Sequence, residues 1–385
     1  MVNNNDKKVL NVPALRFPEF SGEWKHVHLK EIAEFQKQRI STALLNNNNY
    51  ISTENILQDF KGIQCSSSMP ANVNVIKYQN EDILLSNIRP YLKKVWFADR
   101  KGGCSADVLV LRGNKCDKYF LYYVIASDRF INYVMSGIKG VKMPRGDKNQ
   151  MEEYAFSIPT NMEQKRIAKF ISILDERIRL QNKIIEDLKK LKSAIIDKLY
   201  SSTNGETYSF RQLFEVVNEK NKARAYKNVL SASQELGMIE RSDINIDIKF
   251  EQESISGYKI VRKGDYVVHL RSFQGGFAFS DRTGICSPAY IILRPNDLVV
   301  YSYLSHYFTS KPFIKSLKLV TYGIRDGRSI NVDEWLDMPI LLPPAQEQIR
   351  ILTIVNAIDA KLHNEVKVQF CLSSQKSYLL NTMFI

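Results

Sequence analysis

Two long stretches of the chain carry the same alternation of apolar positions. In residues 163–200, apolar side chains recur at alternating steps of four and three residues. This is the period of a helix that packs along a partner helix, so a helix is predicted here. Its seam consists of Ile167, Ile171, Leu174, Ile178, Gln181, Ile185, Leu188, Lys192, Ile195 and Leu199.

The same seam recurs in residues 347–383, where each position lies 184 residues after its counterpart in the first seam. Its positions are Ile351, Val355, Ile358, Leu362, Glu365, Gln369, Leu372, Lys376, Leu379 and Met383. Polar residues interrupt both seams at the same two places, first at Gln181 and Glu365 and then at Lys192 and Lys376. Two unrelated core helices would rarely share both the register and the interruptions. A repeat that spans nearly half of the chain therefore indicates two copies of one plan.

The first half before its helix mixes strand and helix patterns. Residues 72–78 and 107–112 alternate and are rich in β-branched side chains, which predicts strands. Residues 117–135 have an apolar face and predict one helix, and residues 154–158 predict a short strand.

The long helix of the first half has a predicted start. Two overlapping capping boxes, Thr160-x-x-Glu163 and Asn161-x-x-Gln164, come directly before its seam. In the second half a Pro-Pro pair takes this place.

The second half repeats the order of the first. Residues 264–295 correspond to residues 81–112, and residues 301–319 repeat the predicted helix of the first half. The predicted domain boundaries are 1–160, 161–204, 205–344 and 345–385.

The composition indicates which kind of partner the protein binds. The net charge is +13 and the isoelectric point is about 9.3, so the expected partner is a polyanion, most simply nucleic acid. No apolar run approaches the roughly 18 residues of a membrane span, and the first residues lack the apolar core of a signal peptide. We therefore expect a cytoplasmic protein without a membrane partner. The five scattered cysteines form no C-x-x-C pair, which favours reduced thiols over disulfides or zinc.

Basic loops with interleaved aromatic residues are the candidate nucleic-acid interface. In the first half they lie within residues 86–101 and 137–150, and the second half has loops in the same places. Arginine can pair with guanine edges and glutamine with adenine edges, whereas lysine neutralises phosphate. The candidate DNA-binding residues are Arg89, Tyr91, Lys93, Lys94, Lys139, Lys142, Arg145, Lys148, Arg271, Ser272, Phe273, Gln274, Tyr322, Arg325 and Arg328.

Less specific interpretations of these loops stay open. A run of charges is often only a solvated face, although its recurrence in both halves favours a function. Arg89 and Arg271 could instead pair with a carboxylate of their own half. A coiled-coil scaffold whose basic loops bind acidic proteins would also fit.

Catalytic signatures are mostly missing. We find no phosphate-binding loop, no nucleophile elbow and no motif of the kind that amino-methyltransferases use to hold a flipped base. His26 and His28 would share one face of a strand, but no further ligand motif stands nearby. Asp243, Asp247 and Lys249 could form a nuclease metal site, yet they fit the solvent face of an edge strand equally well. A self-sufficient nuclease or methyltransferase is therefore the weaker alternative, and no metal or catalytic residue is assigned.

The chain resembles the specificity subunits of type I restriction–modification systems. The resemblance rests on the opening VPALRFPEFSGEW at residues 12–24, on the helix starts at residues 159–167 and 343–351, and on the duplicated layout. It implies two target recognition domains, each reading one half of a split DNA sequence. The expected fold is therefore α+β, with two pseudo-repeated mixed α/β target recognition domains separated by two long antiparallel coiled-coil helices.

The resemblance also implies partners. This chain would be non-catalytic and bind no cofactor itself. Two methyltransferase subunits would use S-adenosylmethionine, and two restriction subunits would use ATP and Mg²⁺. With antiparallel helices, Ile167 should lie opposite Met383, Gln181 opposite Gln369, and Lys192 opposite Ile358. The seam from Ile167 to Leu199 would span about 50 Å and hold the domains apart.

Overall fold

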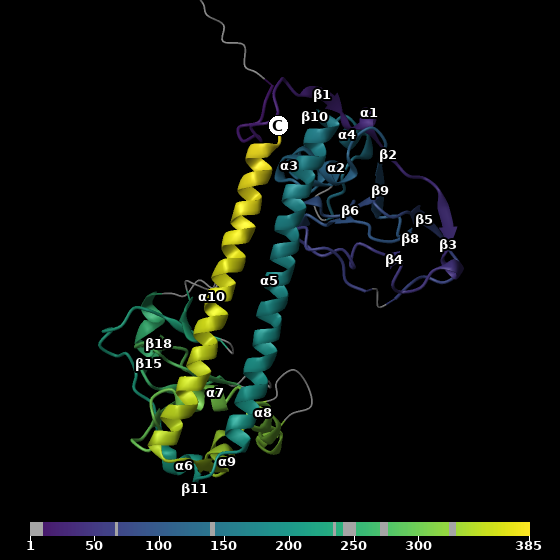
Figure 1. Cartoon of the computed structure of the whole chain (residues 1–385). Helices are drawn as coiled ribbons and strands as arrows, with labels where there is room; N and C mark the ends of the chain where they lie inside the picture. Colours follow the sequence, from purple (N-terminus) through teal and green to yellow (C-terminus); the bar gives the residue numbers. More distant parts are fainter. Residues whose placement is uncertain are drawn as a thin grey trace, which may run out of the picture. The chain divides into compact units, whose positions relative to one another are not determined.

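The chain folds into two compact units (Figure 1). The computed structural model describes residues 11–65, 68–138, 143–233, 236–241, 252–269, 276–322 and 329–385. Unit 1 comprises residues 1–182 and 368–385, and unit 2 comprises residues 183–367. Each unit contains one mixed module and a part of each of two long helices, α5 (Asn161–Ser201) and α10 (Ala345–Met383). None of the described helices is long and apolar enough to cross a membrane.

Unit 1 is built from short strands with small helices beside them. Its strands are β1 (Lys25–His28), β2 (Ala33–Phe35), β3 (Arg39–Ser41), β4 (Tyr50–Ile51), β5 (Asn74–Tyr78), β6 (Ile83–Ser86), β7 (Val95–Phe97), β8 (Gly102–Cys104), β9 (Val108–Gly113) and β10 (Ala155–Ile158). Its small helices are α1 (Leu29–Ile32), α2 (Lys118–Ile125), α3 (Asp128–Ser136) and α4 (Lys148–Glu152). The strands form two sheets in the orders β2-β9-β6-β7 and β3-β5-β8-β4, together with the pair β1-β10.

Unit 2 repeats the central part of this architecture. Its strands are β11 (Glu206–Ser209), β12 (Phe214–Val217), β13 (Leu230–Ser233), β14 (Gly237–Glu240), β15 (Lys259–Val261), β16 (Tyr266–Val268), β17 (Phe277–Phe279), β18 (Gly284–Cys286), β19 (Ile291–Pro295), β20 (Thr321–Tyr322), β21 (Ser329–Ile330) and β22 (Pro339–Leu342). Its small helices are α6 (Phe210–Leu213), α7 (Tyr303–Tyr307), α8 (Lys311–Ser316) and α9 (Val332–Leu336). The sheet β12-β19-β16-β17 has the order of β2-β9-β6-β7, and the pair β11-β22 corresponds to β1-β10. The internal repeat is thereby confirmed.

The prediction of a single helix over residues 117–135 is wrong. The structure has two helices here, α2 and α3, with a break at Ser127. The Ser127 hydroxyl donates to the Val124 carbonyl at 2.6 Å and accepts a hydrogen bond from the Phe130 amide at 3.3 Å. Serine thus ends one helix and caps the next, while the apolar pattern runs on across the break.

The predicted capping boxes at the start of α5 are also wrong in part. The Thr160 hydroxyl does accept a hydrogen bond from the Glu163 amide, at 3.4 Å. However, the Glu163 carboxylate does not return to the cap but pairs with Arg16, with Oε1 2.7 Å from Nε. Gln164 donates to the Pro159 carbonyl and accepts from the Asp117 amide. Both side chains therefore tie the helix to its own module.

A glutamine side chain also ties the start of α10 to its module. Gln348 donates to the Pro343 and Leu298 carbonyls, both at 2.9 Å, and accepts from the Val300 amide at 2.9 Å. It occupies the position in the second repeat that Gln164 occupies in the first, and both side chains are buried. Because it fixes the helix start to the module in each half, this glutamine is part of the repeated plan.

The two long helices pack against each other at opposite ends in each unit. In unit 1, Ile167 at the start of α5 shares an apolar core with Leu379 and Met383 near the end of α10. In unit 2, Ile196 near the end of α5 shares a core with Ile351 at the start of α10. The contacts within each unit are therefore those of antiparallel helices, and all of the seam positions are buried or half-buried.

One ion pair crosses between the helices in each unit. Lys376 Nζ lies 2.5 Å from Asp175 in unit 1, and Lys192 Nζ lies 2.5 Å from Asp359 in unit 2. The two pairs are equivalent, because the two lysines and the two aspartates are related by the same offset as the seams. The lysines that interrupt the seams therefore neutralise aspartates of the facing helix. The Lys192 ammonium group therefore lies beside Asp359, the residue that follows Ile358, the expected neighbour of Lys192.

A histidine lies close to this ion pair in unit 2. Tyr303 and Leu304 correspond to Phe120 and Leu121 of the first half and are equally buried, which places His306 at the position of Tyr123. Tyr123 donates to Asp175 at 2.9 Å in unit 1. Burial lowers the pKa of His306, and the nearby Lys192 lowers this pKa further, against an opposing effect of Asp359.

We therefore expect unit 2 to lose stability in mild acid. A histidine with a lowered pKa in the folded state contributes stability fully above its unfolded pKa of about 6.5. This contribution is lost as the pH falls towards the folded pKa. Hydrogen exchange of unit 2 at pH 7.5 and 5.5 should show this loss, and it should be smaller in His306→Tyr, which carries the residue of unit 1. An equal loss in both proteins would contradict the assignment.

Candidate nucleic-acid interface

Two basic loops of the first half meet in the structure. We call residues 87–94 loop A and residues 143–147 loop B. The Arg89 amide donates to the Pro144 carbonyl at 2.8 Å, and the Gly146 amide donates to the Asn87 carbonyl at 3.1 Å. The two predicted loops therefore form one surface.

The lysines of loop A have partners inside unit 1. Lys93 Nζ lies 2.7 Å from the carboxylate of Asp128, in the first turn of α3. Lys94 Nζ donates to the Thr53 carbonyl at 2.7 Å. Both side chains are only half-exposed, so they anchor loop A to the module.

The described cations on and beside loop B, Arg145 and Lys148, are paired as well. Arg145 Nη1 lies 2.9 Å from the Asp107 carboxylate. Lys148, in α4, lies 4.0 Å from Glu152 and 5.0 Å from the centre of the Phe35 ring. The segment 137–150 was predicted as a loop throughout, but its last residues begin α4, whose first turn is capped by Asp147.

Arg89 and Tyr91 differ from these lysines. Both are exposed, and neither side chain has a hydrogen-bond or ion-pair partner among the described residues. The alternative that Arg89 pairs with a carboxylate thus finds no partner in the described part of the chain. Arg89 directly precedes η2 (Pro90–Leu92), a 3-10 helix of one turn at the tip of the hairpin β6-β7, and Tyr91 lies within η2.

Most candidates of the second half lie outside the described residues. These are Arg271, Ser272, Phe273, Gln274, Arg325 and Arg328, and in the first half Lys139 and Lys142. Tyr322 lies in β20, where its backbone pairs with Ser329. The assignment of these residues to DNA binding stays a prediction.

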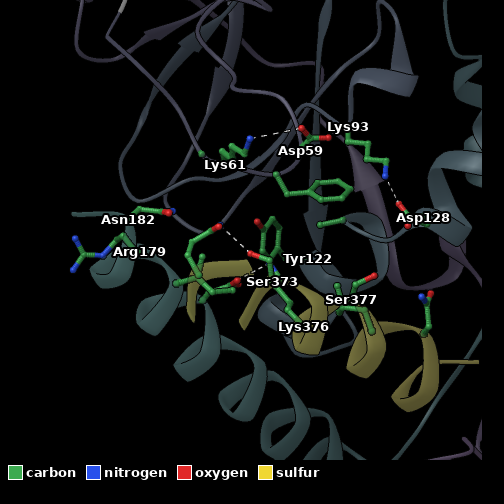
Figure 2. A pocket seen from close by; sticks show the side chains of 18 residues that line it. Asp59, Lys61, Lys93, Tyr122, Asp128, Arg179, Asn182, Ser373, Lys376 and Ser377 are labelled. Atoms are coloured by element: carbon green, nitrogen blue, oxygen red, sulfur yellow. Dashed lines mark hydrogen bonds and ion pairs between the residues drawn. The ribbon is translucent and has the colours of Figure 1, made fainter. Parts of the chain in front are cut away.

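A cleft of about 460 Å³ opens behind loop A within unit 1 (Figure 2). Lys93 points towards Asp128 on the side of the module, and Ser373 and Lys376 line the opposite side from α10 (Figure 2). The cations that line the cleft all have carboxylate partners, namely Lys61 with Asp59, Lys93 with Asp128, Arg179 with Glu176 and Lys376 with Asp175. The cleft therefore offers no unpaired cation to a phosphate, unlike the tip of loop A.

The remaining chemical candidates give no catalytic constellation. Within the described ranges, no group of three or more His, Cys, Asp or Glu side chains could hold a metal ion. His26 and His28 do share a strand face, with ring centres 6.2 Å apart, and His28 Nδ1 lies 3.1 Å from the Glu153 carbonyl. Asp243, Asp247 and Lys249 lie outside the described residues.

The cysteines do not suggest nucleophilic chemistry. All five are free thiols, as expected from their spacing. Cys104 and Cys286 occupy equivalent strands, β8 and β18, and burial raises the pKa of both thiols to about 12. A thiol with so high a pKa is not ionised near neutral pH and is a poor nucleophile.

Sequence reasoning missed the residues that hold the interface together. Asp107, Asp128 and the Thr53 carbonyl each bind a cation of loop A or loop B, yet they come from distant segments. No repeat marked them, because the residue equivalent to Asp107 in the second half is Ala289. The partners of these loop cations can therefore be identified only from the tertiary structure.

The chain is similar to known proteins in sequence and in fold. A family model described as "Type I restriction modification DNA specificity domain" matches residues 21–190 and again residues 205–369. The "Type I restriction enzyme MjaVIII specificity subunit" of Methanocaldococcus jannaschii is 29% identical over 208 residues, covering 51% of this chain and 46% of that protein. The "Putative type I restriction enzyme MjaX specificity subunit" of the same organism is 23% identical over 310 residues, covering 72% and 70%. The match to the first relative thus spans about half of its length.

Solved structures share the fold. The "S subunit from M. genitalium" of a type I restriction–modification system has a TM-score of 0.56 at 15% identity, covering 97% of this chain and 99% of that chain. A chain described as "Structural basis underlying complex assembly and conformational transition of the type I R-M system" has a TM-score of 0.59 at 17% identity, covering 93% and 96%. At these identities the likeness concerns the fold.

Proposed function

Because the chain belongs to the family of type I restriction modification DNA specificity domains, with one copy in each half, we propose that it is a subunit that reads a bipartite DNA target. Each module would bind one part of the target. The observation that carries this proposal is the repeat itself. The same sheet order, helix start and inter-helix ion pair occur in both units, while the basic loops differ in sequence.

The contacts of loop A divide its side chains into two groups. Lys93 and Lys94 are engaged within unit 1 and anchor the loop, whereas exposed side chains on the loop can read base edges. Arg89 and Tyr91 are exposed candidates whose side chains have no hydrogen-bond or ion-pair partner among the described residues of unit 1. The excess of positive charge over the whole chain supports attraction to DNA.

Catalysis would belong to partner proteins. We propose two methyltransferase subunits that use S-adenosylmethionine and two restriction subunits that use ATP and Mg²⁺, acting on DNA in the cytoplasm. This chain would recognise the DNA target and hold the partner subunits in place, and it would bind no cofactor itself. The type I restriction enzymes named among its relatives support this assignment.

Methylation mapping tests the function. The chain is produced together with its methyltransferase partner in a host that lacks other modification systems, and methylated bases are mapped by sequencing. We expect one bipartite motif with a fixed gap. It should be absent when this chain is omitted. Methylation without this chain, or at one contiguous motif, would contradict the proposal.

Two simpler measurements separate the alternatives. An enzyme would modify or cut DNA when the purified chain alone is incubated with S-adenosylmethionine and Mg²⁺, and we expect no reaction. A scaffold for acidic proteins would show no specific DNA binding in the complex with the methyltransferase. We expect binding whose logarithm falls linearly and steeply with the logarithm of the salt concentration.

A further inference from the structure

Loop A is held from one side by loop B and the segment before β9. The Asn87 amide donates to the Asp107 carbonyl at 2.8 Å, and the Arg89 amide donates to the Pro144 carbonyl at 2.8 Å. The Ser86 hydroxyl donates to the Ile88 carbonyl at 2.9 Å. These hydrogen bonds hold the backbone of residues 87–89, the first three residues of loop A.

A second segment holds loop A from the other side. The Asp59 amide donates to the Leu92 carbonyl at 3.2 Å, and the Phe60 amide donates to the Lys93 carbonyl at 3.0 Å. The Lys93 side chain adds its ion pair with Asp128. Because the loop is bound at both ends, its tip is presented on a rigid support and loses little conformational freedom on binding.

The backbone at the tip is in an unfavourable conformation. Arg89 has a φ of 51° and Lys93 a φ of 53°, so both lie in the left-handed region that favours glycine. Such positions cost free energy in residues with a side chain and persist where the surrounding structure holds them. The backbone hydrogen bonds of loop A hold both residues in this conformation. Lys93 also pairs with Asp128, whereas the exposed Arg89 side chain has no partner among the described residues of unit 1.

We propose that Arg89 is a specificity-determining residue of the first module and reads a guanine in the major groove, with Tyr91 contacting the DNA beside it. The proposal rests on the DNA-reading function stated above. A guanidinium can donate two hydrogen bonds to O6 and N7 of guanine, a pattern that no other base offers. Lys93, Lys94 and Lys148 act as positioning residues that hold the surface, since their charges are engaged inside the unit.

Arg145 is the nearest competitor for this role. Its guanidinium already lies 2.9 Å from the Asp107 carboxylate. This pair would have to open, or share the guanidinium, before Arg145 could bind a base with two hydrogen bonds. Among the described residues, the Arg89 guanidinium has no such pair to open.

The experiment uses the chain in complex with its methyltransferase partner. Binding is measured by competition with a set of duplexes in which each base pair of the mapped target is replaced in turn. For Arg89→Ala, we expect the preference at one G·C pair of the first half-site to fall by roughly tenfold to a hundredfold, with the other preferences unchanged. Arg89→Lys keeps the charge but should lose the same preference.

A glycine variant separates function from folding. Arg89→Gly relieves the left-handed strain, so its thermal unfolding midpoint should be equal to or higher than that of the natural chain while the guanine preference is lost. Arg39→Ala is the matched control, because Arg39 is also an exposed arginine of unit 1, on β3. It should leave all base preferences unchanged.

Two outcomes would overturn the proposal. A loss of affinity that is equal for all duplexes would make Arg89 a phosphate contact, and unchanged binding would place Arg89 outside the interface. Neither outcome affects the proposed function, because the natural chain would still bind its target specifically. If the natural chain shows no preference among the duplexes, it is the proposed function that fails.

Discussion

Replacing residues 25–158 by the corresponding segment of a relative with a different target is expected to change one half of the methylated motif and to leave the other half intact. The effect is large, because the half-site should be exchanged outright. Methylation mapping in a host, as described above, measures it directly.

The fold supplies the exchange points. Lys25 and Ile158 are paired in the antiparallel ladder β1-β10, so the segment leaves and rejoins the chain at neighbouring positions. In the second half, Glu206 and Leu342 are paired in the same way in β11-β22. An insertion whose ends are adjacent disturbs the rest of the chain least. Exchange of residues 206–342 is therefore the reciprocal experiment and should alter only the other half-site.

The contacts with the long helices decide what must be retained. Arg16 pairs with Glu163, and the Leu15 amide donates to the Thr382 carbonyl, so residues 11–24 should stay with this chain. Within the graft, Tyr123 should be kept because it donates to Asp175. A change in both half-sites after either exchange would refute the assignment of one module to one half-site. Loss of methylation in a properly folded hybrid would point instead to a lost contact with the methyltransferase.

The features that the sequence predicts well are those that repeat at short intervals. A seam of positions at alternating steps defines each of the long helices, and a misread position or two does not obscure it. The Lys192 and Lys376 interruptions could be located but not explained, since their partners Asp359 and Asp175 lie on the other helix. The break at Ser127 was missed because one serine within an apolar pattern carries little weight.

The sequence likewise predicts only some features of the candidate interface. The basic loops could be located from their charge and from their recurrence in both halves. Which cations are free could not be predicted, since Lys93 and Arg145 find their carboxylates in segments that only the tertiary fold brings close. Arg89 differs from Lys93 and Arg145 because its side chain has no partner among the described residues, and this property leaves no pattern in the sequence.

Each module also contains an ion pair between a half-buried arginine and a buried aspartate. Arg112 on β9 donates two hydrogen bonds of 2.7 Å to Asp82, whose side chain is 2% exposed. In unit 2, Arg294 on β19 donates bonds of 2.9 Å and 3.0 Å to Asp265, whose side chain is 3% exposed. In both units the hydrogen bond to the carboxylate raises the pKa of the arginine, against the effect of burial. The equivalent position marks this pair as part of the repeated scaffold.

Removing the arginine should destabilise only its own unit. In Arg112→Ala the buried Asp82 carboxylate would lose its charged partner and keep the Gln79 amide as a donor. Because the aspartate is buried and the arginine is partly exposed, we expect a loss of about 2 kcal/mol in the free energy of unfolding, between the values for buried and for exposed pairs. Hydrogen exchange followed by mass spectrometry should show faster exchange of peptides from unit 1 in Arg112→Ala, and of peptides from unit 2 in Arg294→Ala.

An exposed pair provides the control for this effect. Arg211 lies 2.7 Å from Asp337, but their side chains are 51% and 66% exposed. Arg211→Ala should therefore cost less than about 1 kcal/mol. The double variant Asp82→Asn with Arg112→Ala should recover part of the loss, because no unpaired charge is left in the interior. If Arg112→Ala costs no more than Arg211→Ala, solvent reaches Asp82 and the pair is not the support of the module.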